Sequence, residues 1–319
     1  MKRALAVVGV VISVAIGAVG CGGGADGVSL KAPNGVVAVD DDPVALLPGS
    51  PVAMGTADLT AFFQNSGFGK AVGALVDTTV PIGEEAKLVP SRDMKRVVWG
   101  SYSFQGVDVV AVVRGDFDGD EIKRRADAHL PAKNGVTLVA SKYADHDVYT
   151  VNNTGFSIVT KRTALVGTEG GIRRALDRIK DGRVKRDAPM WMLQQISTEG
   201  AEFTIAGDFL NQPGSQEALK QIPVAWLSGL TQLRVEGDFK EPGVNVKATL
   251  TYSDDAHATT ASAQMQAQTH LAKLAGVMGL PVPQNIKIQA DKADVQVSFA
   301  VDEAGIRALA ELAPRYLKR

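Results

Sequence analysis

Hydrophobic and polar residues alternate along much of this chain with the period of β-strands, and longer stretches between them show helical spacing. In the first half, alternating or continuous apolar runs predict strands at 51–59, 96–104, 107–117, 136–140, 148–151, 155–160 and 164–167. Apolar residues three and four apart predict helices at 59–76, 118–130 and 169–179, with Ile172, Leu176 and Ile179 on one face of the last.

The second half repeats this order of elements. Strands are predicted at 202–209, 231–239, 244–252, 286–290 and 295–301, and helices at 190–196, 215–226, 254–275 and 303–316. Pro223 should interrupt the helix at 215–226, and Ser253 or Asp254 should cap the long Ala- and Gln-rich helix that follows. Both halves are read as β-α-β-β-α-β-β-α, although four short strands rather than two precede the last helix of the first half. The pattern predicts an α+β fold of two similar halves, each a mostly antiparallel sheet with helices packed on one face.

A recurring tripeptide supports the duplication. Gly-Asp-Phe stands at the end of three predicted strands, at 115–117, 207–209 and 237–239. We expect the glycine to let the chain bend, the aspartate to bond the following turn, and the phenylalanine to point inward. A structural role at strand ends explains the recurrence better than three ligand sites.

Breaks in the pattern suggest the domain limits. Residues 181–189 are charged and contain Gly and Pro, so we place a first half at 47–182 and a second at 190–319. Residues 21–46 lack periodicity and are rich in Gly and Asp, which predicts a flexible tether. The three aspartates at 40–42 are expected to be part of a solvated linker rather than a cation site.

The first residues have the build of a secretory signal peptide. Lys2 and Arg3 precede an uncharged run from Ala4 to Gly20, which small residues close before Cys21. Two other interpretations stay open: a retained transmembrane anchor, although a spanning helix needs about 20 apolar residues, and plain secretion with an incidental Cys21.

Ala18-Val19-Gly20-Cys21 resembles the lipobox of bacterial lipoproteins. The resemblance covers the first 21 residues. It implies that residues 1–20 are a lipoprotein signal peptide, that a peptidase cuts before Cys21, and that the thiol of Cys21 carries a lipid. In that family the residue after the cysteine directs sorting in many two-membrane bacteria, and Gly22 fits delivery to the outer membrane, facing the periplasm or the exterior. The expected partner is therefore a membrane, bound through the lipid on Cys21.

Composition narrows the function classes. Hydrophobic residues make up 45% and charged residues 22% of the chain, which is typical of a globular protein. The net charge of −1 gives no strong field, so nucleic acid is not an expected partner. Cys21 is the only cysteine, so no disulfide within the chain is possible and the apolar core must hold the fold.

The acidic run Asp116–Glu121 could be compared with a calcium loop. Glu121 stands where that loop requires glycine, and Asp127 stands where it requires a bidentate glutamate. Asp118 as a helix cap, with Asp120 and Glu121 beside the positive helix end, explains the same residues. We therefore predict a cap and assign no metal site.

The remaining candidates for chemistry are isolated. None of the histidines (His129, His146, His257 and His270) is spaced like a zinc pair, and His146 lies in a polar turn. Trp99, Trp191 and Trp226 could stack on a sugar or peptide, but core packing is the simpler interpretation. The sequence contains no G-x-S-x-G motif and no phosphate loop. We assign no catalytic residue and no cofactor, and we expect a protein that is not an enzyme.

These observations predict a membrane-anchored envelope lipoprotein whose domain acts as a non-enzymatic binding or scaffolding module, with an envelope protein or an apolar ligand as possible partner. The alternative is a carrier of lipid or another apolar ligand in a cavity between sheet and helices, because residues 107–113 are apolar on both faces. A connected apolar cavity would favour the carrier, and a filled core the scaffold. A hydrolase, the third possibility, would need a cleft with a nucleophile and a base.

Overall fold

The computed structural model comprises two compact units. It describes residues 29–32, 35–64, 69–70, 72–73, 77, 88–103, 108–128, 139–151, 153–277 and 282–304. The first unit contains the described residues between 29 and 60 and between 73 and 193, and the second unit those between 61 and 72 and between 194 and 304.

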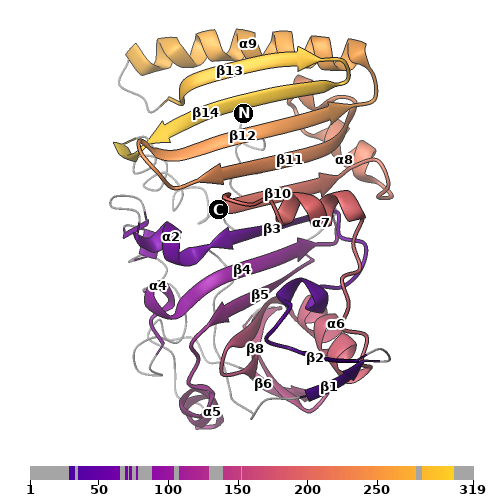
Figure 1. Ribbon diagram of the computed structural model, residues 1–319, viewed down its shortest axis with the longest axis vertical. Coiled ribbons are helices and arrows are strands. Elements are labelled where there is room, and N and C mark those ends of the chain that lie inside the picture. The colour runs from indigo at the N-terminus through magenta and orange to yellow at the C-terminus, as the bar shows by residue number, and fades with distance from the viewer. Residues whose placement is uncertain are drawn as a thin grey trace. The chain divides into compact units, whose positions relative to one another are not determined.

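The first unit is built on antiparallel strands in the order β3-β4-β5-β9-β8-β7-β6. Figure 1 shows β3, β4 and β5 side by side. A separate hairpin, β1 with β2, precedes this sheet in the chain. The strands are β1 (Ser29–Ala32), β2 (Gly35–Ala38), β3 (Ala53–Asp58), β4 (Met94–Ser101), β5 (Val109–Gly115), β6 (Val139–Tyr143), β7 (His146–Val151), β8 (Thr154–Thr160) and β9 (Thr163–Thr168). The helices are η1 (Pro43–Leu46), α4 (Pro90–Asp93), α5 (Gly119–Asp127) and α6 (Glu169–Lys180).

Strand β5 lies in the middle of the first unit's sheet. It pairs with β4 on one side and with β9 on the other, so that Val112 faces both Val98 and Leu165. Val110 and Val112 have no exposed surface, as expected for a central strand that is buried on both faces. The position of β5 in the centre of the sheet therefore explains why residues 107–113 are apolar on both faces, and no bound ligand is needed to explain it.

Helix α6 packs its predicted apolar stripe inward. Ile172 and Leu176 have no exposed surface and Ile179 has 2%. The helix begins where Thr168 accepts a hydrogen bond from the N–H of Gly171 at 3.2 Å, a side-chain N-cap. The positive charges of Arg178 and Lys180 lie in the last turn, where they interact favourably with the negative end of the helix dipole.

The second unit is built on a five-stranded antiparallel sheet with the order β13-β14-β12-β11-β10 (Figure 1). Its elements are β10 (Phe203–Asp208), α8 (Ser215–Gln221), η3 (Ala225–Leu227), β11 (Leu230–Asp238), β12 (Gly243–Tyr252), α9 (Asp255–Val277), β13 (Gln284–Asp291) and β14 (Asp294–Asp302). Helix α9 packs against β12, β13 and β14. Two helices lie where the units meet in the sequence, α2 (Leu59–Gln64) and α7 (Met190–Ile196).

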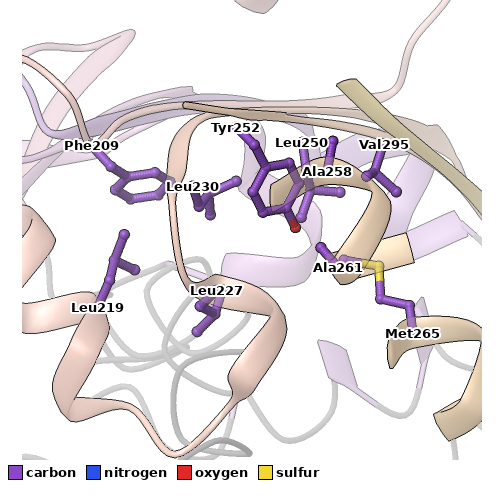
Figure 2. Packing of buried hydrophobic residues seen from close by; sticks show 10 residues of the cluster. All are labelled: Phe209, Leu219, Leu227, Leu230, Leu250, Tyr252, Ala258, Ala261, Met265 and Val295. Carbon is purple, nitrogen blue, oxygen red and sulfur yellow. The ribbon is translucent and has the colours of Figure 1, made fainter. Parts of the chain in front are cut away.

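The core of the second unit fills the space between its sheet and its helices. Figure 2 shows strand residues such as Leu230, Leu250 and Tyr252 facing Leu219, Leu227 and Ala261 from the helical segments. Leu230 and Tyr252 are 2% exposed. The hydroxyl of Tyr252 donates to the Trp226 carbonyl at 2.8 Å, so this buried polar group is satisfied.

Most of the predicted elements are confirmed within a few residues. Pro223 ends α8 as expected, and the chain resumes as η3. The α+β class and the antiparallel pairing are confirmed as well. Residues 105 and 106, between two of the predicted strands, lie outside the described residues, and of the helix predicted at 303–316 only residues 303 and 304 are described.

Part of the segment predicted as a flexible tether, residues 21–46, forms regular structure. Residues 29–32 and 35–38 form the β1–β2 hairpin, and Val39 is 1% exposed. Ala45 and Leu46 are also buried. The end of the tether at residue 46 was therefore wrong, because apolar side chains between 39 and 46 pack on the first unit. What was predicted of residues 21–28 lies outside the described residues.

The boundary between the units also differs from the predicted one. The stretch 181–189 is packed on the first unit, where Arg178 donates to the Lys185 carbonyl at 2.5 Å and Val184 is 5% exposed. The second unit takes in residues from 61 to 72, and the Phe62 ring lies 5.0 Å from that of Phe239. The charged residues and the Gly and Pro at 181–189 are therefore typical of a surface segment of the first unit, and they do not form a linker between the units.

Candidate functional site: Cys21 and the polar clusters of the two units

Cys21, the residue that the sequence singles out most strongly, lies outside the described residues. Its lipidation stays a prediction. None of the helices in the described part of the chain combines the length and the apolar character needed to cross a bilayer.

A surface hollow of about 350 Å³ lies in the second unit, between the start of α9 and the segment around η3. Its lining residues are Ala225, Ser228, Ala256, His257, Thr260, Ala261 and Gln264. Most of them are small or polar, and several are exposed. The Oε1 atom of Gln264 is buried and has no hydrogen-bond partner among the described residues.

His257 is held at the rim of this hollow by the start of α9. Its Nδ1 lies 2.8 and 2.9 Å from the two carboxylate oxygens of Asp254 and 3.2 Å from the Oγ of Ser253. The backbone N–H of His257 donates to Asp254 at 2.9 Å, which confirms Asp254 as the N-cap. This backbone bond, with the imidazole contact, lowers the pKa of the Asp254 carboxyl to about 2.

This arrangement resembles a catalytic triad only in its residue types. In a triad the carboxylate contacts Nδ1 and the serine contacts Nε2 of the same imidazole. Here Asp254 and Ser253 both contact Nδ1, so His257 is not placed to take a proton from Ser253. The ring packs instead on the Gly229 backbone, since a Cβ built on Gly229 would lie 2.6 Å from the Cδ2 of His257. The cluster therefore braces the start of α9.

The other histidines and the tryptophans named from the sequence lie, where they are described, in strands, helices or the core. His146 is half-buried in β7, and burial lowers the pKa of its imidazole against the opposing effect of Asp145 and Asp147. His129 and the side chain of His270 lie outside the described residues. Trp99 is 6% exposed in β4, and Trp226 packs against the core of the second unit, as predicted. Trp191 is half-buried in α7.

The acidic run Asp116–Glu121 is a strand end followed by a helix cap. Asp118 accepts the N–H of Glu121 at 3.4 Å, and Asp116 pairs with Lys95 at 2.6 Å. The cap prediction is confirmed. The described residues contain no group of three or more His, Cys, Asp or Glu side chains that could hold a metal ion.

Sequence reasoning missed a cluster around Asp40 in the first unit. The Oδ1 of Asp40 accepts from the hydroxyls of Thr160 at 2.6 Å and Thr163 at 2.5 Å, and its Oδ2 accepts from the Nε and Nη2 of Arg162 at 3.2 and 3.1 Å. Arg114 donates to the carbonyl of Asp40. We call these five residues the Asp40 cluster.

The Asp40 carboxylate is a structural anchor for the start of the fold. Its side chain is 13% exposed. Burial alone would raise the pKa of this carboxyl, but the bonds from Thr160, Thr163 and Arg162 outweigh burial and lower it. A signal for this was present in the sequence: the β-branched run just before Asp40 is typical of a strand, which places Asp40 at a strand end rather than in a linker.

Comparisons with known proteins give a likeness of fold. No known family and no curated protein matches the sequence. The solved structure of crystal form III of TP0453 has a TM-score of 0.53 at 9% identity, covering 85% of this chain and 98% of that one. Crystal form IV of TP0453 has a TM-score of 0.50 at 10% identity, covering 84% and 96%. At these identities the likeness shows that the chain shares this α+β fold, and it shows nothing about function.

Proposed function

We propose that this chain is a bacterial envelope lipoprotein, lipidated on Cys21, whose folded part serves as a binding or scaffolding module without catalysis. The observation that carries the proposal is the lipobox-like segment Ala18–Cys21 behind a basic start and an uncharged run. A thiol at that place is the acceptor of a diacylglyceryl group in the lipoprotein family. Two or more acyl chains hold a protein stably at a membrane.

The described surroundings of the polar residues support a role without catalysis. Ser253, Asp254 and His257 form a helix cap, and the acids at 116–121 end a strand and begin a helix. Each cluster is explained by the stability of an element that it contacts.

The packed core of the second unit supports a scaffold more than a carrier. Buried apolar side chains from its strands and its helical segments form one cluster between the sheet and the helices (Figure 2). The hollow beside His257 is open at the surface, whereas a carrier needs an enclosed apolar cavity between the sheet and the helices.

The two units support the proposed duplication. In the first unit β3-β4-β5-β9-β8 are neighbours in that order, and in the second β10-β11-β12-β14-β13 follow the same order with the same antiparallel sense. Strands β6 and β7, which follow β8 in the sheet of the first unit, have no counterpart in the described part of the second unit. We propose that the two units descend from one repeated unit. An experimental structure with a different strand order in one unit would contradict this.

Metabolic labelling with an alkyne fatty acid tests the anchor. Expression of the full chain should give a labelled protein in the membrane fraction, and Cys21→Ser should lose both the label and the membrane retention. Gly24→Ala, which changes a nearby residue and keeps the thiol, is the control and should behave as the wild type. Labelled Cys21→Ser in the membrane fraction would refute the proposed site.

We also propose delivery to the outer membrane, on the basis of Gly22. In a two-membrane host, Gly22→Asp should move the protein to the inner-membrane fraction, whereas Gly24→Asp should not. Equal distribution of both variants would contradict sorting by the residue after the cysteine.

A further inference from the structure

Asp40, near the start of the described residues, is bonded to one end of the first unit's sheet. Within the Asp40 cluster, Thr160 and Thr163 flank the turn between β8 and β9, and Arg114 is near the end of β5. Arg114 and Thr163 face each other across the β5–β9 pair. We call this end of the sheet the cluster end.

The β1–β2 hairpin brings an earlier residue to the same place. Ser29 pairs with Ala38, two residues before Asp40. Paired residues in antiparallel strands have Cα atoms about 5 Å apart, and two residues of chain span at most about 7 Å. Ser29 therefore lies within roughly 12 Å of Asp40.

Covalent geometry then limits how far Cys21 can be from the cluster end. Cys21 and Ser29 are eight residue steps apart in the sequence. Because a chain spans at most about 3.6 Å per residue, these eight reach no further than about 29 Å. This is much shorter than the full length that the 26 residues at 21–46 would allow if all of them formed a tether.

The opposite end of the first unit's sheet lies further from the Asp40 cluster, by about the length of one strand. Strand β9 runs from Thr163 at the cluster end to Thr168, where α6 begins. Lys161 is exposed in the turn at the cluster end, and Gly170 is exposed in the first turn of α6 at the other end. At about 3.3 Å per residue, the strand between them separates Lys161 from Gly170 by roughly 20 Å.

From this geometry we propose that the cluster end of the first unit faces the phospholipid surface, with the turn Lys161–Arg162 nearer to the headgroups than the start of α6. The inference depends on the proposed lipidation of Cys21. The reason is steric: if the cluster end turns away from the bilayer, the connection must span the roughly 20 Å to the start of α6, which is most of the about 29 Å that it reaches at full extension and more than a flexible chain of this length spans on average.

The absence of a second cysteine makes the test direct. Once the thiol of Cys21 is acylated, a cysteine introduced elsewhere is the only free thiol in the chain. Lys161→Cys changes an exposed turn residue. Gly170→Cys is its matched partner, because a Cβ built there approaches only the Nη1 of Arg174, at 3.9 Å.

Each variant is purified in lipidated form, labelled with a fluorescent donor and reconstituted in phosphatidylcholine vesicles that carry a headgroup-linked acceptor. We expect energy transfer at least twofold stronger from position 161 than from position 170. Equal transfer, or stronger transfer from position 170, would overturn the inference. Vesicles with added phosphatidylglycerol should give the same ratio, and a preference that appears only with this anionic lipid would overturn the steric argument.

Mass spectrometry of the same samples separates this inference from the proposal on which it rests. A diacylated Cys21 with equal transfer from the two positions would refute only the orientation. An unmodified Cys21, which would itself react with the donor, would refute the lipidation and with it the basis for the orientation.

Discussion

At the scale of single residues, the recurring Gly-Asp-Phe tripeptide is explained by contacts that are nearly the same at two of its three places. A Cβ built on Gly115 would lie 3.0 Å from the Cζ of Phe117, and one built on Gly207 would lie 3.0 Å from the Cζ of Phe209. In both cases the phenylalanine ring lies over the glycine two residues before it. Glycine leaves room for the ring, because a Cβ at either position would lie closer to the ring than an ordinary van der Waals contact.

At the third copy of the tripeptide, the glycine is also covered by a phenylalanine ring, but the ring belongs to another strand. Gly237 is covered by Phe203 of the neighbouring strand, which stacks on Phe239 at 5.3 Å between centroids. The aspartates bond the following turns as predicted at two places, where Asp208 accepts from the N–H of Leu210 and Asp238 from the N–H of Lys240. The strand-end role could be predicted from the sequence. The cross-strand ring could not, because it depends on pairing between distant segments.

These contacts predict different costs for alanine at two of the glycines. A Cβ on Gly115 would lie 2.3 Å from the backbone carbonyl oxygen of Asp93, whereas a Cβ on Gly207 meets mainly the ring edge of Phe209. A ring can shift more easily than a paired strand. We expect Gly115→Ala to lower the free energy of unfolding by about 3 kcal/mol and Gly207→Ala by about 1 kcal/mol. Urea denaturation measures both, and an equal or reversed order would contradict the contacts.

The Asp40 cluster predicts a stability that depends on pH. Because its hydrogen bonds hold the pKa of Asp40 below the unfolded value, the carboxylate adds stability above that unfolded pKa, near 4. This stability is lost as the pH falls through the lower, folded pKa. In a chain that begins at Ser29, Asp40→Asn should therefore destabilise the fold by about 2 kcal/mol at pH 7, and by less below pH 4.

Asp41 provides the matched control. Its side chain is exposed beside Asp40, so Asp41→Asn should change the free energy of unfolding by less than about 0.5 kcal/mol. Urea denaturation of both variants at several pH values gives the comparison. A destabilisation by Asp40→Asn that does not vary between pH 7 and pH 3.5 would contradict the charged role of Asp40.

At the scale of elements, periodicity located most strands and helices because their apolar faces are long enough to repeat. It failed between 29 and 46, where the strands have four residues each and Asp42 caps a single 3-10 turn. Asp42 accepts the N–H of Val44 at 3.1 Å and pairs with Arg186 at 2.8 Å. The three aspartates resembled a solvated linker because the partners of two of them lie more than 100 residues away.

This revised start of the fold predicts the result of truncation. A chain beginning at Ser29 should unfold cooperatively at the temperature of the delipidated full-length protein. A chain beginning at Pro43 loses the buried Val39 and the Asp40 cluster, so it should melt several degrees lower. Calorimetry distinguishes the two. Equal melting temperatures would show that residues 29–42 add nothing to the stability of the first unit.

At the scale of the whole molecule, the order of elements could be predicted from the sequence but the order of strands in the sheets could not. The pattern of strands and helices along the chain implied two related halves. The neighbours β5-β9-β8 and β12-β14-β13 reverse the sequence order of the last two strands in each unit. Such pairing depends on which edges and faces remain free once the earlier strands have paired, and local sequence does not encode this directly.

The candidate site was less predictable than the fold. The anchor prediction rests on a short signal that a signal peptidase would read in an unfolded chain, so a fold comparison at 9% identity does not test it. Conversely, the sequence contained signals for a strand end near Asp40 and for a helix cap at Ser253 or Asp254, but the side-chain contacts of Asp40 and His257 could be identified only from the structure.

Intact mass spectrometry of the native protein, extracted from the membrane fraction of its host, tests the central claim most directly. The account predicts a chain that begins at Cys21 and carries a diacylglyceryl group on its sulfur. A chain that still begins at Met1, or one with a free thiol at Cys21, would contradict it.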